Sequence, residues 1–358
     1  MRDRNQGGIE VILDHNLDVP NCQHGPCLLF ERYPSGSVVR FFACSAYRDR
    51  KHCSFYQNAD DSTKVRKSQL KGNLPKHMDL FKHLLKVRQL APRDRSYCIT
   101  CERLLLPTDF SKHKKHDIIH GLLKKSLKRP SQFLKPVAVS EKEAQFYFNR
   151  PTVEFLVSTC ESLGFDSVLC VGTPRLHEQI IAGRKKHNIR SFLLDLDYRY
   201  ANFWSPRLFA RYNMFVHHFF SKIAKRLYEK FVSQSSKLLV VVDPPFGGLF
   251  EPLEQSLSKI RADFDKLSSD KSAVNTILVA PYFMERKISE VTSCVLSDFQ
   301  VQYDNHPNFK SGTGKKGSPI RFFTDIPGDI FKLPSDYYKY NIHIFMIIFE
   351  FDCICYVV

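Results

Sequence analysis

A short segment of the chain, Asp243-Pro244-Pro245-Phe246, combines a carboxylate, a stiff turn and an aromatic ring directly after an apolar run. The Asp243 side chain and the Pro244 carbonyl can both accept hydrogen bonds, and the two prolines fix the direction of these acceptors. Such acceptors help an exocyclic amine to react, because they hold its protons while the nitrogen becomes pyramidal. Phe246 offers a flat face to a base that has been flipped out of its helix. The segment therefore predicts chemistry on the exocyclic nitrogen of a base.

The same four residues match the motif (Asp, Asn or Ser)-Pro-Pro-(Tyr or Phe) of amino methyltransferases, which use S-adenosylmethionine as the methyl donor. Most of the remaining acceleration would come from holding nitrogen, methyl carbon and sulfur in line. The motif alone leaves the acceptor open, since it also serves DNA adenine and protein glutamine methylation. A proline-rich turn after a buried strand, with no catalytic role, is the structural alternative.

Residues that could bind S-adenosylmethionine follow two further apolar runs. Gly172 ends the run that begins at Ser167, and it takes the place of the glycine-rich turn of such enzymes although it stands there alone. Asp195 ends the run that begins at Ser191 and is well placed to bind the two ribose hydroxyls. Asp197 is the second choice for that role, because residues two apart in an extended chain face the same side.

Three more residues are candidates for contact with the cofactor. Arg175 either contacts the methionine carboxylate or caps the turn after Gly172. Asn213 and Met214 either touch the cofactor adenine or pack beside Phe215.

Two sets of cysteine and histidine residues have the composition of tetrahedral zinc sites. The first set is loosely spaced and consists of Cys22, His24, Cys44 and Cys53. Its surroundings, 40–45 and 48–53, resemble a GRF-type zinc finger, a small sheet that holds a metal and touches nucleic acid through basic and aromatic residues. Scattered reduced cysteines are the alternative.

The second set has a tighter, C2H2-like spacing and consists of Cys98, Cys101, His113 and His116. A Cys-x-x-Cys turn before a histidine pair is a strong zinc signal. Only two residues separate the histidines, which is fewer than usual, so His120 remains a possible substitute for His116. A surface turn without metal is the alternative.

The elements that must position these residues are strands alternating with helices. Buried strands are expected at 167–172, 191–195, 237–243 and 276–280, with helices at 152–163 and 219–233. Continuous apolar strands separated by helices predict an α/β doubly wound, largely parallel sheet of the Rossmann type. Ligands of such sheets bind outside the carboxyl ends of the strands, where Gly172, Asp195 and Asp243 all fall.

Composition narrows the class of partner. The 358 residues are 43% hydrophobic, which allows a sizeable core, and the formal net charge of +16 favours a polyanionic partner, with nucleic acid the first candidate. The 11 cysteines and a charged N-terminus without a signal peptide predict a reducing compartment. The apolar stretch 342–358 is short and contains Glu350 and Asp352, so we expect no membrane span.

The chain resembles the family of zinc-finger CCHC-domain methyltransferases that modify adenine N6 in large-subunit ribosomal RNA. The segments that carry the resemblance include 22–26, 44–53, 98–116, 129–132, 169–178, 193–200, 212–220, 243–249 and 303–306. It implies a GRF finger over 8–60, a C2H2 finger with a basic linker over 61–128, and a class I methyltransferase domain over 129–335. It also implies that Gln145 and Phe148 help to hold the cofactor.

The resemblance further implies S-adenosylmethionine and two zinc ions as cofactors and a structured rRNA stem-loop as substrate. We expect a monomer located in the nucleolus or nucleus and in the cytoplasm. The family continues into a CCHC knuckle, whereas here an apolar tail over 336–358 replaces it, and we hypothesise a truncated or misjoined gene model. A catalytically weak, RNA-binding ribosome-assembly factor on a methyltransferase scaffold is the alternative function.

Overall fold

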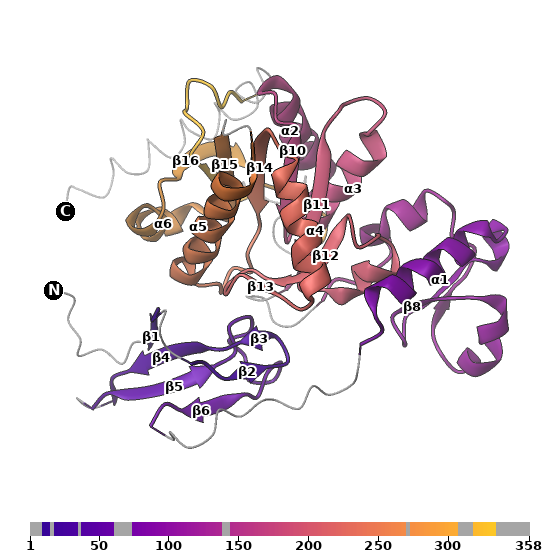
Figure 1. Cartoon of the computed structure of the whole chain (residues 1–358), viewed down its shortest axis with the longest axis horizontal. Helices are drawn as coiled ribbons and strands as arrows, with labels where there is room; N and C mark the ends of the chain where they lie inside the picture. Colours follow the sequence, from indigo (N-terminus) through magenta and orange to yellow (C-terminus); the bar gives the residue numbers. More distant parts are fainter. Residues whose placement is uncertain are drawn as a thin grey trace, which may run out of the picture.

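The computed structural model describes residues 9–14, 18–34, 37–60, 74–137, 144–269, 273–306 and 318–333 (Figure 1). The expected tail over 336–358 and part of the basic linker lie outside these residues. Within the described ranges, no helix combines the length and the apolar character that crossing a membrane requires.

An eight-stranded sheet forms the centre of the molecule, in the order β13-β12-β11-β10-β14-β15-β17-β16. The four expected strands are present as β10 (Ser167–Val171), β11 (Arg190–Asp195), β14 (Lys237–Val242) and β15 (Ala273–Pro281). These four and β12 (Phe209–Asn213) are parallel to one another. The sheet is completed by antiparallel pairings of β13 (His218–Phe219), β17 (Ile320–Thr324) and β16 (Val295–Gln300). The predicted α/β, Rossmann-like architecture is confirmed.

Helices cover both faces of this sheet, which explains why its central strands are largely apolar and why β10 is buried at every position. Alternate residues of β10 point to opposite faces: Val168 and Cys170 join one buried cluster, and Leu169 and Val171 join the other. The first cluster contains buried residues of α2 (Arg150–Ser162) and α3 (Pro174–Gly183). The second contains those of α4 (Lys222–Ser233), α5 (Phe250–Leu267) and α6 (Glu285–Val291).

Capping residues set the starts of two helices differently from the expected bounds. Asn149 accepts a hydrogen bond from the backbone N–H of Thr152, so α2 begins at Arg150. Ser221 caps α4, which therefore begins at Lys222, while Phe219 belongs to strand β13 instead of the helix.

The N-terminal module is a small antiparallel sheet, although its sequence shows little strand periodicity. Its strands are β1 (Ile9–Ile12), β4 (Leu28–Arg32), β5 (Val39–Ala43) and β6 (Tyr56–Asn58), with a short hairpin of β2 (Asn21–Cys22) and β3 (Gly25–Pro26). In Figure 1 this module lies below the main sheet, near β13.

The second module combines helix α1 (His77–Gln89) with a three-stranded sheet of β7 (Ser96–Cys98), β8 (Arg103–Leu105) and β9 (Ile118–Ile119). Figure 1 shows it on the side of the domain away from β16. Its residues Leu84, Val87 and Leu104 belong to the same buried cluster as α2 and α3. The module and the main α/β domain therefore share one hydrophobic core.

Candidate active site and metal centres

The carboxyl ends of β10 and β14 meet where the strand order reverses, which is the position at which ligands bind in doubly wound sheets. Gly172 follows β10 with a φ of +67°, and a Cβ added to it would lie 2.8 Å from the carbonyl oxygen of Asp243. The Asp243 backbone N–H donates to the Val171 carbonyl at 3.1 Å. A single glycine therefore suffices at this turn, because the conformation and the close approach both need a residue without a side chain.

One cavity opens at this point and brings together most of the residues singled out from the sequence. Those that line it are Gln145, Gly172, Asp195, Asp197, Asn213, Met214, Asp243, Pro244, Pro245 and Phe246. Phe148 and Arg175 are absent from this lining and instead line a second cavity beside α3. Ala46 and Tyr47 of the N-terminal module also line the first cavity, a contribution that the sequence did not suggest.

Two carboxylates lie at one end of the cavity, and their hydrogen bonds distinguish them. Asp197 is occupied by the guanidinium of Arg199, whose Nε and Nη2 lie 2.8 and 2.6 Å from its two oxygens. Asp195 accepts the backbone N–H of Asp197 at 2.9 Å. Burial, and after it the Asp197 carboxylate, raise the pKa of Asp195 to about 7. The geometry favours Asp195 as the acceptor for ribose hydroxyls, since Asp197 is already paired.

Asn213 is committed to a structural task. Its side-chain NH₂ donates to the carbonyl of His24 and to the hydroxyl of Ser45, both at 2.8 Å, and its oxygen accepts the N–H of Phe215. These bonds attach the N-terminal module to the end of β12. Both amide hydrogens of Asn213 are therefore used to hold the N-terminal module, while Asn213 and Met214 both line the cavity and Met214 lies beside Gly172.

Of the three other residues expected to hold the cofactor, one lies at the cavity wall and two lie behind it. The Gln145 side-chain oxygen accepts the hydroxyl of Tyr147 at 2.8 Å, which holds Gln145 at the cavity wall. Arg175 donates to Asp304 and, at 3.0 Å, to the carbonyl of Phe148. Phe148 is buried and stacks on Tyr303. Arg175 and Phe148 thus lie behind the wall of the first cavity, and the guanidinium of Arg175 is held by Asp304 and the Phe148 carbonyl.

The other end of the cavity is built around Asp243. Tyr303, which is fully buried, donates its hydroxyl to Asp243 Oδ1 at 3.0 Å. Burial raises the pKa of Asp243 well above its usual range, and the Tyr303 hydrogen bond offsets part of this rise. The ring of Phe246 stacks on Phe146 with centroids 5.3 Å apart, and His306 lies 4.5 Å from Phe146. A carboxylate within an aromatic surround is suited to hold a flat base by its exocyclic amine.

Sequence reasoning missed Tyr303 and Phe146 as site residues. Tyr303 comes from the connection that follows β16, about sixty positions from Asp243 in the chain, so no local spacing links the two. The only signal was the resemblance: Tyr303 lies in the matching segment 303–306, and Phe146 lies between Gln145 and Phe148, which the resemblance implies as cofactor residues.

The first cysteine and histidine set is a compact cluster in the N-terminal module. The ligand atoms of Cys22, His24, Cys44 and Cys53 all lie within 4.8 Å of one another, and the four side chains are buried. Cys44 Sγ lies 3.4 Å from His24 Nδ1. Bonds of about 2.0 to 2.3 Å in a tetrahedron place sulfur and nitrogen about 3.5 Å apart, so the set fits zinc.

The second set is equally compact, and it decides between the two candidate histidines. Cys98, Cys101, His113 and His116 form the cluster, with His116 Nδ1 3.2 Å from Cys101 Sγ and 3.1 Å from His113 Nδ1. His120 instead lies with its Nδ1 2.9 Å from the Ser96 hydroxyl. His116 therefore belongs to the site, and the short spacing of the histidine pair is no obstacle.

Comparison with known proteins gives a consistent assignment. The family model described as "Probable N6-adenine methyltransferase" matches residues 140–316. The rRNA N(6)-adenosine-methyltransferase ZCCHC4 of Homo sapiens is 39% identical over 355 residues, which cover 93% of this chain and 69% of the relative. The proteins of the same name from Xenopus laevis and Mus musculus are 40% and 38% identical, covering 92% and 93% of this chain and 72% and 69% of the relatives. The site geometry and these matches agree, and the chain belongs to the rRNA N(6)-adenosine-methyltransferase family.

Proposed function

We propose that this protein transfers a methyl group from S-adenosylmethionine to N6 of an adenosine in large-subunit ribosomal RNA. The observation that carries the proposal is the cavity at the strand crossover, with Asp243 and its aromatic neighbours at one end and Asp195 at the other. Membership of the rRNA N(6)-adenosine-methyltransferase family supports the acceptor.

The residues of the chain have separate roles in this reaction. Asp195 accepts hydrogen bonds from the ribose hydroxyls of the cofactor. Gly172 lets the backbone turn close to the Asp243 carbonyl. S-adenosylmethionine, when bound, supplies an electrophilic methyl group on a sulfonium centre. Phe246 stacks on the adenine, and the Asp243 carboxylate and the Pro244 carbonyl accept the two N6 hydrogens. Alignment of the amine with the methyl group supplies most of the acceleration.

The enclosed position of Asp243 in the cavity suits this role, because hydrogen bonds to a carboxylate are stronger where there is little water. Its oxygen can accept a hydrogen bond from the amine, whose nitrogen gains positive charge as the methyl group arrives. The Tyr303 hydroxyl holds one oxygen of Asp243, so the other oxygen is left to face the base. We infer that Tyr303 is a positioning residue for the carboxylate.

We further propose that each cysteine and histidine cluster binds one zinc ion. Four protein ligands complete a tetrahedral shell, which is typical of structural rather than catalytic zinc. Elemental analysis of the purified protein should give two zinc atoms per chain.

The RNA partner is supported by the formal net charge of +16, since a strongly basic chain attracts a polyanion. We propose that the substrate is a structured stem-loop, that the protein acts as a monomer, and that it works in the nucleolus or nucleus and in the cytoplasm. The alternative, a weakly catalytic assembly factor, loses one of its two arguments, because the lone Gly172 makes a well-formed turn; the other is the replacement of the CCHC region.

The acceptor class can be tested directly. The protein is incubated with methyl-labelled cofactor and, separately, large-subunit rRNA, a DNA oligonucleotide with the same target sequence, and a glutamine-containing peptide. Label in the rRNA alone supports the proposal. Preferential labelling of DNA or peptide would refute the RNA acceptor, even though the methyltransferase chemistry would stand.

A further inference from the structure

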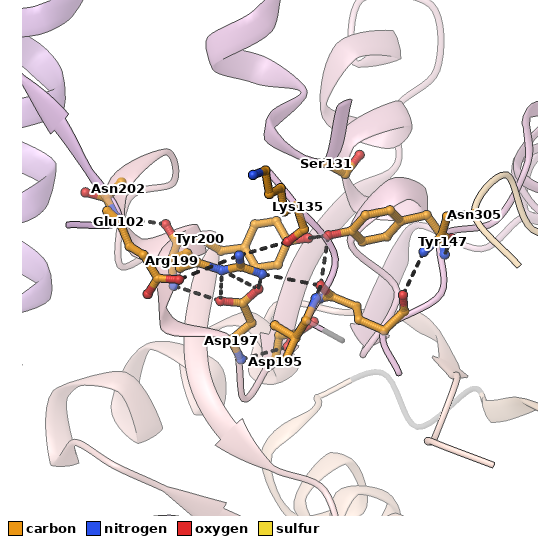
Figure 2. A network of polar contacts seen from close by, with 12 residues as sticks. Glu102, Ser131, Lys135, Tyr147, Asp195, Asp197, Arg199, Tyr200, Asn202 and Asn305 are labelled. Carbon is orange, nitrogen blue, oxygen red and sulfur yellow. Dashed lines mark hydrogen bonds and ion pairs between the residues drawn. The ribbon is translucent and has the colours of Figure 1, made fainter. Parts of the chain in front are cut away.

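Arg199 is the point at which four separate segments of the chain meet (Figure 2). Its guanidinium contacts the carboxylate of Asp197 and the carboxylate of Glu102. It also donates to the Lys135 carbonyl at 2.9 Å and lies 3.5 Å from the side-chain oxygen of Gln145. These partners come from the second module, the connection after it, the loop before α2 and the loop after β11.

The ion pair at the centre of this network is shielded from water. The side chains of Arg199 and Asp197 are 11% and 8% exposed, and two nitrogens of the guanidinium face the two carboxylate oxygens. A forked pair of this kind fixes direction as well as charge, which lysine cannot reproduce. Removal of one partner leaves an uncompensated buried charge.

On one side, the network holds the metal-binding turn of the second module. Glu102 follows the ligand Cys101 directly and adopts a left-handed φ of +53°. Its carboxylate lies 3.8 Å from Arg199, and its backbone carbonyl accepts the side-chain NH₂ of Asn202 at 3.0 Å. Coordination of a metal by Cys101 would therefore fix the turn that presents Glu102 to Arg199.

On the other side, the network ends at the cofactor cavity. The Asp197 N–H donates a hydrogen bond to the Asp195 carboxylate. The side-chain oxygen of Gln145 accepts hydrogen bonds from the Arg199 guanidinium and from the hydroxyl of Tyr147. Asp195, Asp197 and Gln145 all line the cavity, whereas Arg199 does not. A guanidinium outside the cavity thus orients three residues of its wall.

We propose that Arg199 is a positioning residue through which the second metal-binding module holds the ribose end of the cofactor cavity in its binding geometry. Cofactor affinity then depends on a module that does not itself touch the cofactor. The inference rests on the proposed function, since it takes the cavity to bind S-adenosylmethionine.

The test uses calorimetry to compare the wild type with variants, each purified and zinc-loaded, in their affinity for S-adenosylhomocysteine, the reaction product. Arg199→Gln should weaken binding at least about tenfold, which corresponds to the loss of one charge-assisted hydrogen bond. Arg199→Lys, which keeps the charge but not the fork, should fall between the wild type and Arg199→Gln. Arg207→Gln removes the same charge at an exposed arginine and should leave the affinity unchanged.

A pH profile separates this role from a merely structural one. The groups that face Asp195 are the Asp197 carboxylate, the Arg199 guanidinium and the hydroxyls of Tyr147 and Tyr200. Arg199 is the cation among them and lowers the pKa of Asp195. Ribose binding needs the Asp195 carboxylate, so the pH at which affinity is half lost should move upward in Arg199→Gln.

A double-mutant cycle tests the link to the module. Glu102→Gln should weaken binding by up to about fivefold in the wild type, as expected for a partly exposed pair, and have no effect in Arg199→Gln. Glu285→Gln, at an exposed glutamate on α6, is the matched control.

The outcomes are decisive. Wild-type affinity within twofold in Arg199→Gln, an unmoved pH midpoint, or additive effects of Glu102→Gln and Arg199→Gln would overturn the proposal. If Arg199→Gln does not fold, Arg199→Lys decides, and affinity equal to that of the wild type would overturn it. A wild-type protein that binds no S-adenosylhomocysteine would instead refute the proposed function itself.

Discussion

Gly172→Ala is the substitution whose effect can be worked out most fully from the structure. Gly172 has a φ of +67°, and an added Cβ would lie 2.8 Å from the Asp243 carbonyl oxygen and 3.1 Å from the terminal methyl carbon of Met214. A left-handed conformation costs a residue with a side chain about 1–2 kcal/mol. Overpacking against backbone adds about 1–3 kcal/mol. The combined loss of unfolding free energy should be about 2–5 kcal/mol.

The matched control is Gly164→Ala. Gly164 has nearly the same φ, +69°, but a Cβ there meets nothing within 4 Å, so only the backbone term remains. Chemical denaturation of the two variants and the wild type measures both terms, and their difference isolates the contact with Asp243. Calorimetry with S-adenosylhomocysteine should show weaker binding in Gly172→Ala alone, since the added methyl group pushes the Asp243 loop away from β10.

Equal destabilisation of Gly172→Ala and Gly164→Ala, with wild-type cofactor affinity in both, would refute this reasoning. It would mean that β10 and β14 separate easily at their carboxyl ends, and that the close approach does not shape the site.

Three further predictions follow from contacts around the cavity. Tyr303→Phe should lower the methyl-transfer rate about tenfold or more without changing the affinity for S-adenosylhomocysteine, because it removes only the hydroxyl that holds Asp243. Single-turnover kinetics measures the rate, and an unchanged rate would contradict the prediction. Asn213→Ala should loosen the N-terminal module, because it removes the hydrogen bonds to His24 and Ser45, and should lower the unfolding free energy by about 2–3 kcal/mol. Limited proteolysis should then cut the module faster, and protease resistance equal to that of the wild type would argue against a role of Asn213 in holding it. Binding of S-adenosylhomocysteine should weaken as the pH falls through about 7, because Asp195 becomes protonated and loses its negative charge. An affinity that does not change between about pH 6 and 8 would exclude Asp195 as the ribose acceptor.

The sequence was sufficient for the four central strands of the main sheet, β11, β10, β14 and β15, because these strands are buried on both faces. The apolar runs that end at Gly172, Asp195 and Asp243 marked three adjacent strand ends, and the catalytic turn follows directly from one of them. At these points, the residues that could do chemistry are therefore neighbours in the chain of the strands that position them. This is why the cavity wall could largely be predicted before the structure.

The parts that could not be predicted depend on contacts between distant segments. Nothing in the spacing places Tyr303 on Asp243 or Arg199 between Glu102 and Gln145. Strand periodicity did not reveal the sheets of the two modules, because their strands are short and the cysteine and histidine clusters, rather than periodic apolar residues, organise them. Only the resemblance to a GRF-type finger implied a small sheet in the first module.

The choice between alternatives for single residues also required the structure. Asn213 looked equally suited to cofactor contact and to packing, and its hydrogen bonds to His24 and Ser45 give it a third role. Arg175 follows Gly172 closely in sequence, yet its guanidinium turns toward Asp304. Side-chain direction at such positions is set by partners that no local pattern reveals.

The central claim is that Asp243 serves methyl transfer to adenine N6 of ribosomal RNA, and nucleoside mass spectrometry tests it most directly. Large-subunit rRNA is incubated with S-adenosylmethionine and either wild-type protein or Asp243→Ala, then digested to nucleosides. The account predicts that N6-methyladenosine increases with the wild type and stays at background with Asp243→Ala. An equal increase with both proteins, or no increase with a wild type that binds the cofactor, would contradict it.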